Sequence, residues 1–124
     1  MALQNTIETI NSTLREIMEE DPRVFVLGED VEMGGTFGAT EGCLEAFGPG
    51  RVIDTPLAEA SIVGIAIGAA LGGLLPVAEI QFADFIHAAV DQIVNEAAKM
   101  RYRSNGAFSC PIVVRAPYGG GITG

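Results

Sequence analysis

Short segments that are apolar throughout alternate along this chain with longer segments whose apolar residues recur at helical spacing. The predicted strands are 24–27, 51–54, 76–80 and 111–115, and the predicted helices are 6–20, 56–74 and 84–103, with a short helix around 41–47. A strand that is apolar on both faces is typical of a parallel sheet covered by helices. The alternation therefore predicts an α/β fold, a parallel sheet flanked by helices on both faces.

The most apolar part of the chain, 61–75, is shorter than the roughly 20 residues that a membrane span needs, so we interpret it as a buried helix. Within it, Gly64, Gly68 and Gly72 recur at every fourth position. This spacing gives a helix a flat ridge against which another helix can pack closely. The second helix could belong to the same domain or to another subunit.

The composition is that of one domain with a full apolar core, because 48% of the 124 residues are hydrophobic. The net charge of −9 argues against nucleic-acid binding and against an anionic membrane surface, since both require basic residues. Cys43 and Cys110 have no CxxC spacing and no paired histidine, so no metal site is predicted. Two such thiols without a signal peptide favour a reducing compartment, and we expect a cytoplasmic protein.

One carboxylate, Glu59, stands at the beginning of an apolar stretch in which the next charged residue is Glu79. A carboxylate in an apolar site has a raised pKa, because burial disfavours the charged form, and it can then share a proton near neutral pH. The alternative is an exposed glutamate in the first turn of a helix, where its charge favours the helix dipole. Spacing alone favours this second interpretation.

Several common catalytic motifs are absent. The chain has no GxxxxGK[ST] sequence, which excludes a P-loop, and its glycines do not follow a predicted strand in GxGxxG order. The only histidine, His87, falls in the first turn of a predicted helix, where a structural or exposed role is expected rather than that of a base. No Ser–His–Asp or Cys–His arrangement is predicted.

Five blocks in this order resemble the β subunit of thiamine-diphosphate-dependent 2-oxoacid dehydrogenases, the decarboxylating component of the pyruvate and branched-chain complexes. They are LGEDVEMGGTFGATEG (27–42), RVIDTPLAEASIVGIAIG (51–68), PVAEIQFADF (76–85), DQIVNEAAKMRYRSNG (91–106) and PIVVRAPYGGG (111–121). The most diagnostic piece is Glu-x4-Gly-x3-Gly, which begins at Glu59. The resemblance covers the whole chain and implies a pyrimidine-binding domain of the transketolase type.

The resemblance implies that Glu59 is catalytic: it hydrogen-bonds the aminopyrimidine ring of thiamine diphosphate and shares a proton with it, which reverses the preference for an exposed glutamate. The activated cofactor then decarboxylates a 2-oxoacid, and the acyl unit passes to a lipoyl group. It also implies cofactor contacts by the backbone of Leu57, by Gln81 in the ring pocket and by Phe85, whose flat ring would stack. Glu29 resembles an acidic residue between two cofactor sites. Ordinary core packing of Phe85 and a surface position of Glu29 are the alternatives.

By the same resemblance, the cofactor lies between two subunits, and an α subunit holds its diphosphate through Mg²⁺. The expected partners are that α subunit, a second β subunit in an α2β2 heterotetramer, and a lipoyl-bearing acyltransferase core. Residues 1–124 would be a pyrimidine-binding domain shortened at its C-terminal side, without the family's second domain and a histidine for acyl transfer, and inactive alone. The strings EIQFADF and RYRS favour a branched-chain 2-oxoacid. A pyruvate or acetoin dehydrogenase β subunit and a non-catalytic cofactor-binding or oligomerisation module are the alternatives.

Overall fold

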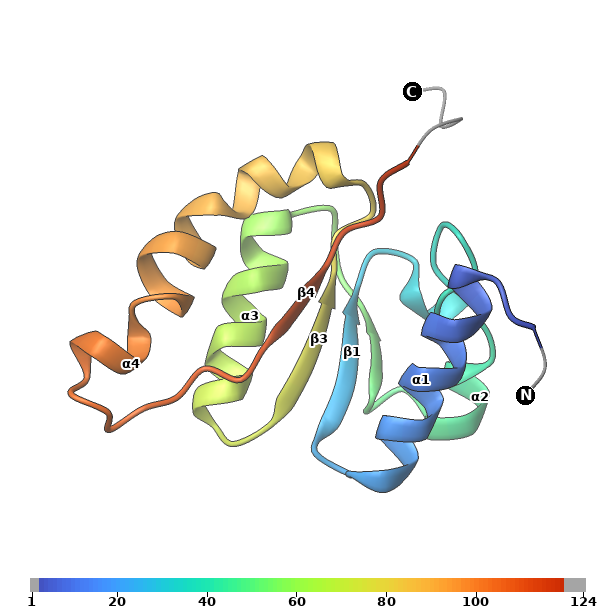
Figure 1. Ribbon diagram of the computed structural model, residues 1–124, viewed down its shortest axis with the longest axis horizontal. Coiled ribbons are helices and arrows are strands. Elements are labelled where there is room, and N and C mark those ends of the chain that lie inside the picture. Colours follow the sequence, from blue (N-terminus) through green and yellow to red (C-terminus); the bar gives the residue numbers. More distant parts are fainter. Residues whose placement is uncertain (1–2, 120–124) are drawn as a thin grey trace.

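The computed structural model describes residues 3–119, and its core is a sheet in which all described strand pairings are parallel. The strands lie in the order β2-β1-β3-β4, and they are β1 (Val24–Gly28), β2 (Val52–Asp54), β3 (Leu75–Glu79) and β4 (Val113–Arg115). Helices α1 (Thr6–Glu20) and α2 (Cys43–Phe47) cover one face, and α3 (Glu59–Leu71) covers the other (Figure 1). The predicted parallel sheet with helices on both faces is therefore confirmed.

Local sequence explains where α1 begins and ends. Asn5 precedes the helix, and its Oδ1 accepts a hydrogen bond from Glu8 N, while the Glu8 carboxylate accepts one from Asn5 N, both at 2.9 Å. This reciprocal pair satisfies two N–H groups that the first turn would otherwise leave without partners. The helix ends at Glu20, before Pro22, as predicted.

The central position of β1 explains its uninterrupted apolar sequence. Val24 and Val26 pack with α1 in one core cluster, whereas Phe25 and Leu27 pack with α3 in the other. Because successive side chains of a strand point to opposite faces, each residue meets the helix on its own side. The chain thus has two apolar cores, one on each side of the sheet.

Helix α3 is shorter than the predicted range 56–74. It begins at Glu59 and ends at Leu71, just before Gly73, whose φ of 91° belongs to the left-handed region that glycine adopts readily. Gly64 and Gly68 lie on a face of α3 where an added Cβ would meet nothing within 4 Å. Within residues 3–119 the ridge therefore does not pack closely against another helix of this domain, which contradicts the internal-packing alternative.

The prediction of one helix over 84–103 is wrong. The segment forms a 3-10 helix η2 (Ala83–Ala89), a π-helix η3 (Gln92–Ala97) and a short α4 (Met100–Arg103), lying along α3 (Figure 1). Ile86 and Ala89 both reach the α3 core because residues three apart share a face of a 3-10 helix. The π-helix η3 has wider turns than the 3-10 helix η2. With this change in geometry, Ile93 also packs against the α3 core. Val90 and Val94, which a regular helix over 84–103 would place on the same side as Ile86 and Ile93, are 42% and 49% exposed.

The outer parts of the fold also differ from expectation. Strand β4 is shorter than the predicted range 111–115, and Val113 is 55% exposed because β4 lies at the edge of the described sheet and pairs there only with β3. The long loop after β1 contains a 3-10 turn, η1 (Val31–Met33), before α2. Most of the glycine-rich segment 117–124 lies outside the described residues. Among residues 3–119, no helix has the length and apolarity needed to cross a membrane.

Candidate functional site

The last residues of the four strands lie in one row across the sheet. Asp54 pairs with Gly28, Gly28 with Glu79, and Glu79 with Arg115. In Figure 1 the strands β1, β3 and β4 end at the upper edge of the sheet. From β1 the chain crosses over to β2 on one side of the sheet, and from β3 it crosses over to β4 on the opposite side. The two connections therefore run in opposite directions, and the switch point lies between β1 and β3. Ligands of open parallel sheets bind outside the carboxyl ends of the strands at such a switch point. The residues that follow β1, β2 and β3 therefore define the candidate site.

Gly28 allows the two strands at the switch point to approach closely. A Cβ at this position would lie 2.6 Å from Glu79 O and 3.0 Å from Glu79 Cβ. Both atoms belong to a buried strand and cannot move aside as a flexible side-chain tip would. Any larger residue would therefore push β1 away from β3 at the site itself.

Glu59 is the first residue of α3 and follows β2. It lies in the first helical turn, as the alternative interpretation held, but only 9% of its surface is exposed. The N–H groups at the start of a helix stabilise a nearby negative charge, so a buried glutamate is tolerated at this position. The structure thus combines burial with a helix N-terminus, which the sequence had presented as alternatives.

Glu29 directly follows β1 and is 7% exposed, so the alternative of a surface position is contradicted. Its Oε1 is buried and has no hydrogen-bond partner among the described residues. Burial raises the pKa of Glu29, and the negative charges of Glu59 and Asp30 raise this pKa further. The effect of Glu59 means that the carboxyl groups of Glu29 and Glu59 lie near enough to interact electrostatically.

Gln81 lies one residue beyond Ile80, on the β3 side of the switch point. Its Nε2 donates a hydrogen bond of 3.1 Å to Asp30 Oδ2, which belongs to the turn after β1. Asp30 has a φ of 55°, which is uncommon for a residue other than glycine. The contact joins the two sides of the switch point and places Gln81 beside the Glu29 turn.

Aromatic rings extend from this edge of the sheet. The Phe82 ring makes edge-to-face contacts with Phe85 and with Phe37, each with 5.7 Å between ring centroids. Phe85 is 45% exposed, so the core-packing alternative does not describe it. Leu57 lies in the loop between β2 and α3 and is 75% exposed. The structure thus gathers Glu29, Glu59 and Gln81 at the strand ends and places Leu57 and Phe85 on flanking segments.

Three residues of this edge were missed by sequence reasoning. They are Asp30, which accepts a hydrogen bond from Gln81; Phe82, whose ring contacts that of Phe85; and Thr55, whose Oγ1 is buried and has no hydrogen-bond partner within residues 3–119. Thr55 N donates to Gly28 O at 2.9 Å, so the hydroxyl lies at the same row of strand ends. Their position in the sequence could have indicated these residues, because each follows the end of a predicted strand by three residues or fewer.

The chain matches the family described as the transketolase pyrimidine-binding domain over residues 3–124.

The chain belongs to this family.

Relatives at high identity are dehydrogenase β subunits. The chain is 62% identical over its whole length to the 2-oxoisovalerate dehydrogenase subunit beta of Bacillus subtilis. It is 54% identical over 93% of its length to subunit beta 2 of the mitochondrial 2-oxoisovalerate dehydrogenase of Arabidopsis thaliana. It is 51% identical over 94% of its length to the pyruvate dehydrogenase E1 component subunit beta of Leifsonia xyli. The chain spans only 38%, 32% and 35% of these three relatives, respectively.

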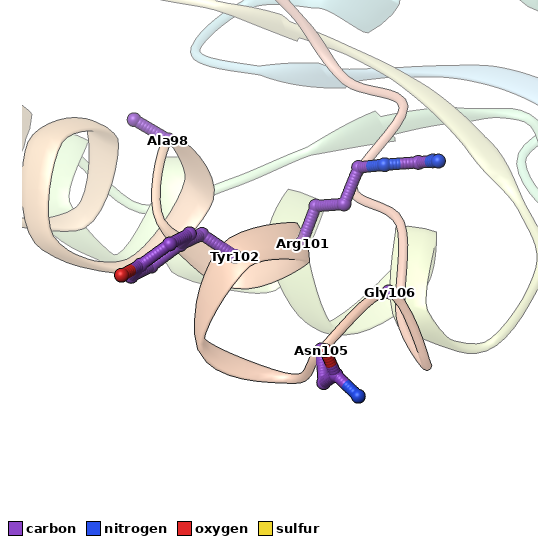
Figure 2. Close-up of a pocket in the computed structure, with 5 residues that line it drawn as sticks. All are labelled: Ala98, Arg101, Tyr102, Asn105 and Gly106. Carbon is purple, nitrogen blue, oxygen red and sulfur yellow. The ribbon is translucent and has the colours of Figure 1, made fainter.

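In this transketolase-type pyrimidine-binding domain, the surface also has a pocket that contains none of the strand-end residues. The pocket in Figure 2 is lined by Ala98, Arg101, Tyr102, Asn105 and Gly106. It contains no carboxylate and none of the predicted site residues. In the part of the chain that the structure describes, no group of three His, Cys, Asp or Glu side chains could hold a metal ion.

Proposed function

We propose that this chain is the aminopyrimidine-binding part of the β subunit of a thiamine-diphosphate-dependent 2-oxoacid dehydrogenase, with a branched-chain 2-oxoacid as substrate. The observation that carries the proposal is the buried Glu59 at the start of α3, together with the buried, unpartnered carboxyl oxygen of Glu29 at the end of β1. The family and the names of the relatives support the cofactor and the reaction class. The 62% identity to a 2-oxoisovalerate dehydrogenase subunit supports the branched-chain substrate.

The residues at the strand ends fit an aminopyrimidine ring. Such a ring is planar and carries both N–H donors and nitrogen acceptors along its edge. Glu59 and the unpartnered Oε1 of Glu29 offer carboxyl oxygens, and Phe85 offers a partly exposed aromatic face. A buried oxygen without a partner is costly, so a bound donor would remove a penalty that the protein alone carries.

Thiamine diphosphate would supply the nucleophilic carbon and the electron sink that decarboxylation of a 2-oxoacid requires. The contribution of this chain is to hold and share a proton. Glu59 would bind the ring nitrogen through a hydrogen bond that keeps the proton between carboxyl and ring, in a site with little access for water. The raised pKa of Glu29 favours its protonated form, in which its carboxyl group can donate a hydrogen bond as well as accept one.

The proposal includes partners, because residues 3–119 contain no group of three His, Cys, Asp or Glu side chains that could hold the Mg²⁺ of the diphosphate. An α subunit would hold both, and the enzyme would be a cytoplasmic α2β2 heterotetramer that passes its acyl group to a lipoyl-bearing acyltransferase. The open ridge at Gly64 and Gly68 supports close packing of α3 against another subunit. Ile65, which is 54% exposed on the same helix, would be covered in that interface.

The test is turnover of the assembled enzyme after Glu59→Gln, which keeps the shape of the side chain and removes its exchangeable acid. We expect turnover to fall about 10²- to 10⁴-fold, as for loss of a general acid–base group. Glu45→Gln, on the exposed side of α2, is the matched control and should leave turnover unchanged. Equal turnover of the Glu59→Gln variant and the wild type would favour a non-catalytic cofactor-binding module.

Substrate preference needs a separate assay, because a relative at 51% identity is named as a pyruvate dehydrogenase subunit. The kcat/KM of the assembled enzyme should be compared for pyruvate and for 2-oxoisovalerate. A higher value for 2-oxoisovalerate supports the branched-chain proposal, and a higher value for pyruvate supports the alternative.

A further inference from the structure

The hydrogen bond between Gln81 and Asp30 connects segments that are 51 residues apart in sequence. It crosses the switch point, because Asp30 follows β1 and Gln81 follows β3. Both residues lie next to buried positions, Glu29 on one side and Ile80 on the other. A contact in this place can therefore set the geometry of the candidate site.

The turn that carries Asp30 is held in an unusual conformation. Asp30 has φ 55° and ψ 16°, in the left-handed region, where a short polar side chain is tolerated better than most. Its carbonyl oxygen accepts hydrogen bonds from Met33 N at 3.1 Å and from Gly35 N at 2.8 Å. The backbone of the turn is thus fixed, with Glu29 buried and the next side chain, Asp30, directed to Gln81.

The chemistry of the two side chains decides which way the Gln81 amide faces. An ionised carboxylate can only accept hydrogen bonds, whereas an amide has a donating nitrogen and an accepting oxygen. Asp30 therefore requires the Nε2 end of Gln81 to face it, at the observed 3.1 Å. The other end of the amide, Oε1, is left as an acceptor for a ligand.

We propose that Asp30 is a positioning residue that orients Gln81 so that Oε1 accepts a hydrogen bond from the ring amino group of the cofactor. The inference rests on the proposed function, because it takes the ligand to be the aminopyrimidine of thiamine diphosphate. Asp30 itself does not touch the ligand and acts through Gln81. It makes the site selective for a ring that carries an N–H donor at this point.

Calorimetric titration of the assembled enzyme tests this inference with two probes. The first is thiamine diphosphate, and the second is its analogue in which hydrogen replaces the ring amino group. Asp30→Gly suits the left-handed backbone and removes the carboxylate. We expect it to weaken thiamine diphosphate binding about threefold to tenfold, the effect of one hydrogen bond, and to change analogue binding less than twofold. Asp84→Asn, an exposed acid in η2, should change neither.

Asp30→Asn provides a second variant that keeps the size of the side chain and tolerates the same backbone. Its amide could face Gln81 with either end, so we expect a smaller loss with the same selectivity for the ring amino group. Equal weakening of both probes by Asp30→Gly, or no weakening of thiamine diphosphate, would overturn the inference. If the wild-type enzyme binds neither probe, the proposed function fails as well, and this outcome is distinct from a failure confined to the Asp30 variants.

Discussion

Replacing Glu79 with glutamine should destabilise the folded protein by about 3 kcal/mol, because it leaves the Arg115 cation buried without its counter-ion. Arg115 Nη2 lies 2.6 Å from Glu79 Oε1, and Arg115 Nε donates to Oε2 at 3.0 Å. The Glu79 side chain is 2% exposed and that of Arg115 is 15% exposed. The pair joins the carboxyl ends of β3 and β4. Its loss should therefore loosen the strand ends on which the candidate site is built.

The magnitude follows from burial. Removing one partner of a buried ion pair costs about 3 to 5 kcal/mol, and the partial exposure of Arg115 places this pair at the lower end. With a urea dependence of about 1 to 3 kcal/mol per molar, the midpoint of unfolding should fall by roughly 1 to 3 M. The measurement is urea unfolding of the purified protein followed by circular dichroism.

Glu96→Gln is the matched control, since it makes the same chemical change in an exposed pair. Glu96 and Arg103 are 3.7 Å apart, with side chains 50% and 61% exposed, so the expected loss is about 0 to 1 kcal/mol. A double variant, Glu79→Met with Arg115→Met, should recover most of the stability, because it removes both buried charges. The reasoning is refuted if Glu79→Gln lowers the midpoint no more than Glu96→Gln does.

Three further predictions concern pH, the close strand approach and the helix cap. Burial, together with the charges of Glu59 and Asp30, raises the pKa of Glu29 above its ordinary 4.5, so the wild type should lose stability as pH rises from about 4.5 through the raised pKa. The melting-temperature advantage of Glu29→Gln over the wild type should therefore grow toward pH 7, and an advantage that shrinks would contradict this cause. Gly28→Ala should lower the free energy of unfolding in urea by about 1 to 3 kcal/mol or more, because the added Cβ would lie 2.6 Å from Glu79 O. Gly68→Ala is the control: a Cβ on this exposed face of α3 would meet nothing within 4 Å and should not destabilise the isolated chain. Asn5→Ala should lower the free energy of unfolding by about 1 kcal/mol through loss of the cap, and an unchanged value would show that the start of α1 contributes nothing.

Much of the fold could be predicted from the sequence because its signals are local. The capping residues and the apolar stripe define α1, and the apolar run of β1 requires helices on both faces of a parallel sheet. The apolar stretch around Glu59 made this residue a candidate, and the resemblance added Gln81 and gave both residues their roles. These features depend on neighbours in sequence, and periodicity reports such neighbours directly.

Other features depend on contacts between distant segments and were decided by the tertiary structure. The segment 84–103 has helical periodicity, but packing on α3 changes its turns from 3-10 to π geometry. Parallel pairing brings the ends of β1, β2 and β3 to one edge of the sheet. This arrangement buries Glu29, exposes it to the charge of Glu59, and allows the hydrogen bond between Gln81 and Asp30. The sequence alone determined which segments become strands and helices; their pairing in space decided which side chains meet, because the order of strands in the sheet differs from their order in the chain.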